Sequence, residues 1–157
     1  MLAGAALRVR RATEHDARAA ATIIAEALAE YALPFEPEGR DADVATFGDK
    51  PEHDDFVAED GASGRALGVA SVGPQGDEGV AWISKVFVAK EARRRGVGRA
   101  LLEAAHAAAR SRGFREVGLR TRVIFREAIA LYESAGYVRR EDPAAIAPGD
   151  VVYYRRL

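Results

Sequence analysis

The stretch at residues 82–102 constrains the fold more than any other part of this chain. Its first part, 82–88, is rich in β-branched and aromatic residues and predicts a buried strand. Apolar residues then recur at helical spacing from about 98 to 112, and Gly113 follows as a stop signal. Between them lies a short loop, 93–99, with four arginines and two glycines. This order of strand, basic loop and helix predicts a mixed α/β fold.

The loop at 93–99 has the features of an anion-binding site. The first backbone N–H groups of a helix have no partner inside the helix, and the helix dipole adds partial positive charge there. Glycines allow a positive φ and a close approach of the backbone to a phosphate, and the arginines add full charges. We therefore predict a phosphate or pyrophosphate ligand at this helix start. A solvated turn is the alternative, so the surrounding motifs decide between the two.

Two common phosphate-binding patterns do not fit the loop. The nucleotide-triphosphatase loop needs G-x-x-x-x-G-K-[ST], and the dinucleotide fingerprint needs a third glycine where Leu101 stands. Arg93-x-x-Gly96-x-Gly98 instead matches R/Q-x-x-G-x-G/A and resembles the GNAT acetyltransferase superfamily, in which this loop holds the pyrophosphate of acetyl-coenzyme A. The resemblance implies that the cofactor contacts Val86, Phe87, Val88, Arg93, Arg94, Arg95, Gly96, Val97, Gly98 and Arg99.

A second motif at 127–137 strengthens this resemblance. The family commonly shows A-x-x-L-Y-x-x-x-G-F/Y here, after the glycine loop and in the same order along the chain. Two motifs in the right order are more specific than either alone, and the resemblance covers most of the chain, least so over 32–65. The matching residues are Ala128, Leu131, Tyr132, Gly136 and Tyr137.

The remaining segments predict further strands and helices, and no linker or repeat divides the chain, so we expect one domain over residues 1–157. The resemblance implies the GNAT fold: a mixed, mostly antiparallel sheet of about seven strands with helices on both faces. Its fourth and fifth strands, 82–88 and 116–121, would run parallel and splay apart to leave a cleft. The other predicted strands lie at 7–12, 55–59, 67–72, 137–140 and 151–155, and the other helices at about 14–31 and 124–135.

Composition excludes several classes of function. The formal net charge is −1, so no global field attracts nucleic acid or an anionic membrane. The chain has no cysteine, which excludes disulfides, thiolate metal sites and a cysteine nucleophile, and we expect no metal. No apolar run approaches the ~20 residues of a membrane span, and residues 1–7 are too short for a signal peptide. We therefore expect a cytoplasmic protein without nucleic-acid or membrane partners.

Tyr132 is the predicted catalytic residue. Acetyl transfer from a thioester to an amine requires loss of an amine proton, stabilisation of an oxyanion and protonation of the departing thiolate. In the family a tyrosine at this place lies beside the sulfur, which implies that Tyr132 is the general acid. The alternative is a core aromatic packed with Phe125 and Ile129. Main-chain N–H groups of 86–88 are the expected donors to the thioester oxygen.

The general base and the acceptor are less well defined by the sequence. Candidate bases are Glu30, His53 and Glu78, or a water chain, although His53 also reads as an exposed loop histidine. His106 is expected to face solvent. Protein N-terminal acetyltransferases of the superfamily often carry a glutamate on the fifth strand and an asparagine before the last helix. Here those positions hold Arg120 and Phe125, which argues against a peptide acceptor.

Arg120 and Arg122 suggest an acidic group on a small acceptor, because arginine binds carboxylates through two parallel hydrogen bonds. Solvated arginines, or arginines that bind cofactor phosphate, are the alternative. The expected function is transfer of an acetyl group from acetyl-coenzyme A to a primary amine of a small molecule, directly in a ternary complex. A non-catalytic acyl-coenzyme A sensor, a peptide N-acetyltransferase and a nucleic-acid module are the rival hypotheses. The resemblance also allows a homodimer.

Overall fold

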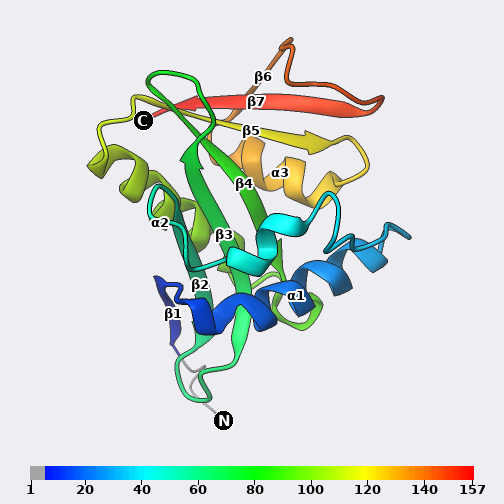
Figure 1. The fold of residues 1–157 in the computed structure, drawn as a ribbon, viewed down its shortest axis with the longest axis vertical. Coiled ribbons are helices and arrows are strands. Elements are labelled where there is room, and N and C mark those ends of the chain that lie inside the picture. Colours follow the sequence, from blue (N-terminus) through cyan, green and yellow to red (C-terminus); the bar gives the residue numbers. More distant parts are fainter. Residues whose placement is uncertain (1–5) are drawn as a thin grey trace.

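A computed structural model describes residues 6–157, so the prediction that residues 1–7 form no signal peptide falls mostly outside the described residues. Seven strands form one sheet in the order β1-β2-β3-β4-β5-β7-β6 (Figure 1). All neighbouring strands are antiparallel except β4 and β5, which are parallel, as predicted. The strands are β1 (Leu7–Arg11), β2 (Asp54–Asp60), β3 (Ala66–Pro74), β4 (Val80–Val88), β5 (Glu116–Arg122), β6 (Val138–Arg140) and β7 (Asp150–Arg156).

Three α-helices accompany the sheet: α1 (Ala17–Ala29), α2 (Val97–Ser111) and α3 (Arg126–Ser134). The first predicted helix begins with a separate 3-10 turn, η1 (Glu14–Asp16), which is closed by a capping box between Thr13 and Asp16. Two further 3-10 turns, η2 (Ala42–Thr46) and η3 (Lys90–Ala92), lie in segments for which no helix was predicted. These turns are short because their hydrogen bonds close within three residues.

Helices cover both faces of the sheet and define two core layers (Figure 1). On one face, Leu101 and Leu102 of α2 are almost fully buried against the strands, together with Tyr132 of α3. On the other face, Ile24 of α1 packs with Phe47 after η2. Full burial of such a side chain contributes about 1.5–3 kcal/mol, so these two layers hold the helices against the sheet.

His106 is buried, at 3% exposed, and the expectation that it faces solvent was wrong. The buried stripe of α2 is wide enough to include the position four residues after Leu102. Arg155 Nη1 lies 2.6 Å from His106 Nδ1, and His106 Nε2 lies 2.6 Å from the Tyr137 hydroxyl. Burial, followed by the nearby cations Arg155 and Arg110, lowers the pKa of His106 to about 4. The histidine is therefore neutral in the folded protein near pH 7.

The two parallel strands pair only over their first halves. Residues 80–83 of β4 are in register with residues 116–119 of β5, and no pairing continues beyond Ile83. The β3–β4 register shifts so that Ser84 is an extra residue on β4, a β-bulge that bends the strand. β5 meanwhile stays paired with β7 as far as Arg122. The strands therefore diverge at the centre of the sheet. Within the described residues, no helix is both long and apolar enough to cross a membrane.

Candidate functional site

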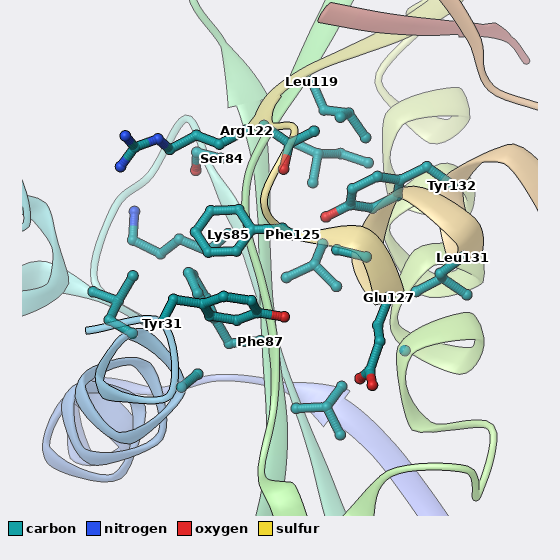
Figure 2. Close-up of a pocket in the computed structure, with 18 of the residues that line it drawn as sticks. Tyr31, Ser84, Lys85, Phe87, Leu119, Arg122, Phe125, Glu127, Leu131 and Tyr132 are labelled. Atoms are coloured by element: carbon teal, nitrogen blue, oxygen red, sulfur yellow. The ribbon is translucent and has the colours of Figure 1, made fainter. Parts of the chain in front are cut away.

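A cleft of about 1040 Å³ lies where β4 and β5 diverge (Figure 2). β4 and the following loop form one wall, and the end of β5 with α3 forms the other. The end of α1 and the loop after it cover part of the opening. Side chains from segments far apart in the sequence thus meet in one cavity. The lining residues used below are Tyr31, Ser84, Val86, Val88, Arg93, Arg94, Gly96, Gly98, Arg99, Arg120, Arg122, Phe125, Glu127, Tyr132 and Ile146.

The loop before α2 presents unpaired backbone donors to this cleft. Within residues 6–157, no protein acceptor lies within hydrogen-bond distance of the amide N–H groups of 94–99, whereas Ala100 N–H already bonds to Gly96 O at 3.0 Å. Two residues of the loop have left-handed backbone, Arg94 at φ 62° and Gly96 at φ 77°. The N–H groups and the dipole of a fifteen-residue helix therefore converge where the sequence predicted an anion.

The two glycines of the loop serve different purposes. A side chain at Gly96 would meet nothing within 4 Å, so glycine is favoured there by its positive φ. A Cβ at Gly98 would instead lie 2.7 Å from Leu131 Cδ2. Gly98 therefore allows the start of α2 to pack closely against α3. This packing links the two sequence motifs in space.

The four loop arginines are in different environments. Arg93 donates two hydrogen bonds to Glu30 at the end of α1, one of them 2.9 Å long, and a weak one of 3.5 Å to Val88 O. Arg99 Nη2 donates to Ser134 Oγ at 2.7 Å. Arg95 is 4.0 Å from Asp60 and does not line the cleft. Within the described chain the guanidinium of Arg94 has no hydrogen-bond or ion-pair partner, so it is the cation of the loop most available to an anion.

The N–H groups of β4 divide between the two sides of the strand. Ala89 N–H donates to Leu67 O at 2.8 Å, so it points toward β3. Because the direction alternates along a strand, the N–H of Phe87, two residues earlier, points toward β3 as well. Val86 and Val88 alternate with them. Their N–H groups consequently point toward the gap that β5 has left, where an extended ligand can accept them as it would accept those of a sheet edge.

Tyr132 lies in the deep part of the cleft. Its side chain is 6% exposed, and Figure 2 shows its hydroxyl directed into the pocket beside Leu119. Within the described residues the hydroxyl makes no hydrogen bond. Burial raises the pKa of Tyr132 well above that of a free phenol. The ring also packs against Tyr137, with centroids 5.8 Å apart, so the side chain belongs to both the core and the cleft.

An aromatic contact crosses the cleft. The rings of Tyr31, after α1, and Phe125, before α3, meet edge to face with centroids 4.8 Å apart. Figure 2 shows Phe125 between Lys85 and the side chains of α3. Sequence reasoning named Phe125 as a departure from the family pattern and as a packing partner of Tyr132 in the alternative role of that residue, and it gave Tyr31 no role in the site. Their contact depends on how far α1 lies from α3, and the sequence around either residue does not predict that distance.

The candidate bases are scattered by the fold. Glu30 is held by Arg93, and Glu78, in the β3–β4 turn, does not line the cleft. His53 is mostly buried rather than exposed, and it borders a separate cavity of about 70 Å³. Sequence reasoning missed Glu127, which lines the cleft and lies 4.0 Å from Arg93. Its position one helical turn before Leu131 was the available signal.

Both arginines of β5 line the cleft, but only one has a protein partner. Arg120 Nη1 donates to Ala144 O at 3.2 Å, whereas the side chain of Arg122 has no hydrogen bond or ion pair with a described residue. Within residues 6–157 no three His, Asp or Glu side chains are grouped closely enough to hold a metal ion. The polar groups that line the cleft include backbone N–H groups, arginines and the phenol of Tyr132.

Comparison with known proteins supplies an independent view of this arrangement. The model of the acetyltransferase (GNAT) family matches residues 21–137. No match is found among the curated proteins.

Solved structures share the fold over nearly the whole chain. A GCN5-related N-acetyltransferase from Kribbella flavida is 28% identical, with a TM-score of 0.77 and coverage of 97% of this chain and 98% of that one. A GNAT-family acetyltransferase from Staphylococcus aureus is 17% identical, with a TM-score of 0.80 and coverage of 96% and 99%. The PaiA N-acetyltransferase from Thermoplasma acidophilum, solved in complex with coenzyme A, is 13% identical, with a TM-score of 0.75 and coverage of 97% and 99%.

Proposed function

Because the chain belongs to the GNAT acetyltransferase family, we propose that it transfers an acetyl group from acetyl-coenzyme A to a primary amine of a small molecule. The single observation that supports this most strongly is the cleft between β4 and β5, with the unpaired N–H groups of 94–99 at one end and Tyr132 inside. The N–H groups of 94–99 suit a diphosphate, and the space beside Tyr132 suits a thioester.

The diphosphate of coenzyme A is held by the start of α2. The amides of 94–99 donate to the phosphate oxygens, and their hydrogen bonds are strengthened because the acceptor is ionised. Arg94 and Arg99 supply full positive charge at the same place. Arg93 contributes indirectly, since its ion pair with Glu30 holds the loop against the end of α1.

The β4 backbone positions the reacting end of the cofactor. Val88 N–H and O face the gap and pair with the amide groups of the pantetheine arm, as an added strand would. Val86 N–H faces the same gap and donates to the thioester oxygen as negative charge develops on it. Loss of one such donor typically costs about 3–4 kcal/mol of transition-state stabilisation. Phe87 contributes its side chain to the core under α1 and leaves its N–H in the sheet.

Tyr132 protonates the departing sulfur. The amine nitrogen forms a bond to the acetyl carbon, the carbon–sulfur bond breaks, and the electron pair of that bond leaves with the sulfur. The Tyr132 hydroxyl gives its proton to this thiolate, and the proton lost by the amine passes to water and restores the phenol. Because burial raises the pKa of Tyr132, the hydroxyl stays protonated at neutral pH. Burial of a thiolate raises its proton affinity too, which favours the transfer.

The transfer is direct, in a ternary complex. The chain has no cysteine to carry the acetyl group between two half-reactions. We therefore expect no exchange of label between acetyl-coenzyme A and coenzyme A when the amine is absent.

The experiment is a panel of primary amines incubated with acetyl-coenzyme A, with the release of free thiol as the readout. We expect thiol release that requires both the protein and an amine, with the N-acetylated product identified by mass spectrometry. Thermal stabilisation by coenzyme A without thiol release for any amine would instead assign an acyl-coenzyme A sensor. Acetylation of peptide N-termini alone would replace the small-molecule acceptor with a peptide.

A further inference from the structure

Resting on the proposed function, we propose that the acceptor is an α-amino acid with an apolar side chain, and that Arg122 binds its carboxylate. Arg122 ends β5 and is half-buried in the wall of the cleft. Figure 2 shows its guanidinium on the same side of Phe125 as Ser84 and on the opposite side from Tyr132. We call this part of the cleft, lined by Tyr31, Ser84, Arg122, Phe125 and Ile146, the acceptor side. It is separate from the start of α2, where we propose that the phosphates bind.

Three charged residues on the acceptor side are engaged within the protein. Lys85 is buried and forms an ion pair with Asp43. Asp150 accepts the N–H groups of Ile146 and Ala147 at 3.2 and 2.9 Å. Asp41 accepts the N–H of Glu36 at 2.8 Å. Glu36 and Arg40, which also line the cleft, are exposed and make no side-chain hydrogen bond or ion pair within residues 6–157, and no carboxylate lies within ion-pair distance of Arg122.

The guanidinium of Arg122 is thus a half-buried cation without a partner among residues 6–157. A partly desolvated charge gains more from an anionic ligand than a fully solvated one does, because screening by water is weaker. The planar guanidinium presents parallel N–H groups that match the two oxygens of a carboxylate. Ser84, at the bulge of β4, lines the same cleft, and its hydroxyl makes no hydrogen bond to a described residue, so it offers a further donor on the acceptor side (Figure 2).

Apolar side chains surround the same space. The rings of Tyr31 and Phe125 form one boundary, and Ile146 stands at the mouth of the cleft with 77% of its surface exposed. An exposed isoleucine that lines a cleft gains by covering an apolar group of the ligand. An acceptor that satisfies both features has a carboxylate for Arg122 and an apolar side chain for these residues. Its α-amine would lie between them, toward the acetyl group.

The test compares amino acids with their decarboxylated counterparts. Leucine, methionine, phenylalanine and tryptophan are each assayed beside the amine that remains after loss of the carboxylate, with thiol release as the readout. We expect kcat/KM to be about 10- to 100-fold higher for the amino acid in the preferred pair, the range expected for hydrogen bonds between charged partners. Arg122→Gln abolishes this preference by raising KM for the amino acid and leaves the decarboxylated amine unchanged.

Two further variants make the result specific. Arg122→Lys keeps the charge but not the paired donors, so we expect it to restore only part of the preference. Arg126→Gln removes an equal charge from an exposed residue of α3 that does not line the cleft, and it should retain the full preference. An equal preference in Arg122→Gln and in the unaltered protein would overturn the role of Arg122. Faster acetylation of the amines without carboxylate would overturn the amino-acid acceptor while leaving acetyl transfer intact.

A binding measurement separates this inference from the proposed function. N-acetylated amino acids and N-acetylated amines are titrated by calorimetry into the protein saturated with coenzyme A. We expect the carboxylate-bearing products to bind about 10-fold more tightly or better, and Arg122→Gln to remove the difference. If no amine of any kind releases thiol, acetyl transfer fails as the function, yet this titration still reports on Arg122. Equal binding of the two product classes would refute the carboxylate site.

Discussion

Arg93 and Glu30 form a two-point ion pair that joins the loop before α2 to the end of α1. The two residues lie 63 positions apart in the sequence, and the hydrogen bonds to Glu30 raise the pKa of the Arg93 guanidinium further. The arginine that begins the glycine motif is therefore engaged inside the protein before any ligand arrives. This arrangement distinguishes Arg93 from Arg94, whose guanidinium has no partner among the described residues.

We predict that Arg94→Gln weakens coenzyme A binding more than Arg93→Gln does. Arg94 is available to the diphosphate, whereas Arg93 mainly holds the loop against α1. An exposed charge–phosphate contact of about 1.4 kcal/mol corresponds to a tenfold change in Kd. Isothermal titration with coenzyme A should therefore show a Kd about tenfold higher for Arg94→Gln and a change of about threefold or less for Arg93→Gln. The reverse order would make Arg93 the principal phosphate ligand.

We predict that Tyr132→Phe lowers kcat by about 10²- to 10⁴-fold, the usual contribution of a general acid. The substitution removes one oxygen and keeps the packing of the ring against Tyr137. The hydroxyl makes no hydrogen bond to a described residue, so its removal should leave the thermal midpoint and the Kd for coenzyme A nearly unchanged. Unaltered turnover with an unaltered pH profile would show that the ring serves only the core.

Gly96→Ala should weaken coenzyme A binding because it disturbs the loop backbone. A non-glycine residue at φ 77° is strained by about 1–2 kcal/mol, and relaxation of that strain would rotate the amides that face the diphosphate. Gly64→Ala is the matched control, since Gly64 has φ 72°, equally open surroundings and a place in the β2–β3 turn away from the cleft. The free energy of unfolding in urea should fall by a similar amount in both variants. Only Gly96→Ala should bind coenzyme A more weakly. Equal affinity in both would remove the loop amides from the binding site.

Because of His106, the free energy of unfolding should decrease as the pH falls from about 6.5 to about 4. Burial lowers the pKa of His106 from 6.5 to about 4, so the unfolded chain takes up a proton in this interval and the folded protein does not. The stabilisation is complete above pH 6.5 and is lost on acidification, up to about 3 kcal/mol in total. Buried carboxylates such as Asp54, whose pKa is lowered from 3.8, act at still lower pH.

The measurement is the free energy of unfolding in urea at pH 7 and pH 4.5, for the unaltered protein and for His106→Gln. Glutamine does not titrate, so the variant should lose less stability between the two pH values, although it starts from a lower value because the contacts with Tyr137 and Arg155 are altered. An identical loss in both proteins would mean that His106 is protonated in the folded state, or that other groups dominate.

Local patterns predicted most of the fold. The strand at 82–88, the start of α2 near Gly98 and the end of α3 before Gly136 agree with the structure to within a few residues, because periodicity and capping act over one or two turns. The segment after α1 was less well predicted. Its 3-10 turn η2 is held by burial of Val44 and Phe47 under α1. This is a tertiary contact, and the local pattern of prolines and glycines does not predict it.

By itself, the sequence determined the order of the helices and strands and the glycine loop at the start of a helix. It also determined that a tyrosine, Tyr132, lies in the second motif at 127–137. The tertiary structure decided which side chains are available for chemistry. Arg93 is engaged by Glu30, and Arg122 has no side-chain partner among residues 6–157. His106 is buried, and Tyr132 lines the cleft. The physical reason is the range of the interactions. Helix and strand formation depends on neighbours a few residues away, whereas burial and ion pairing depend on side chains brought together from distant segments.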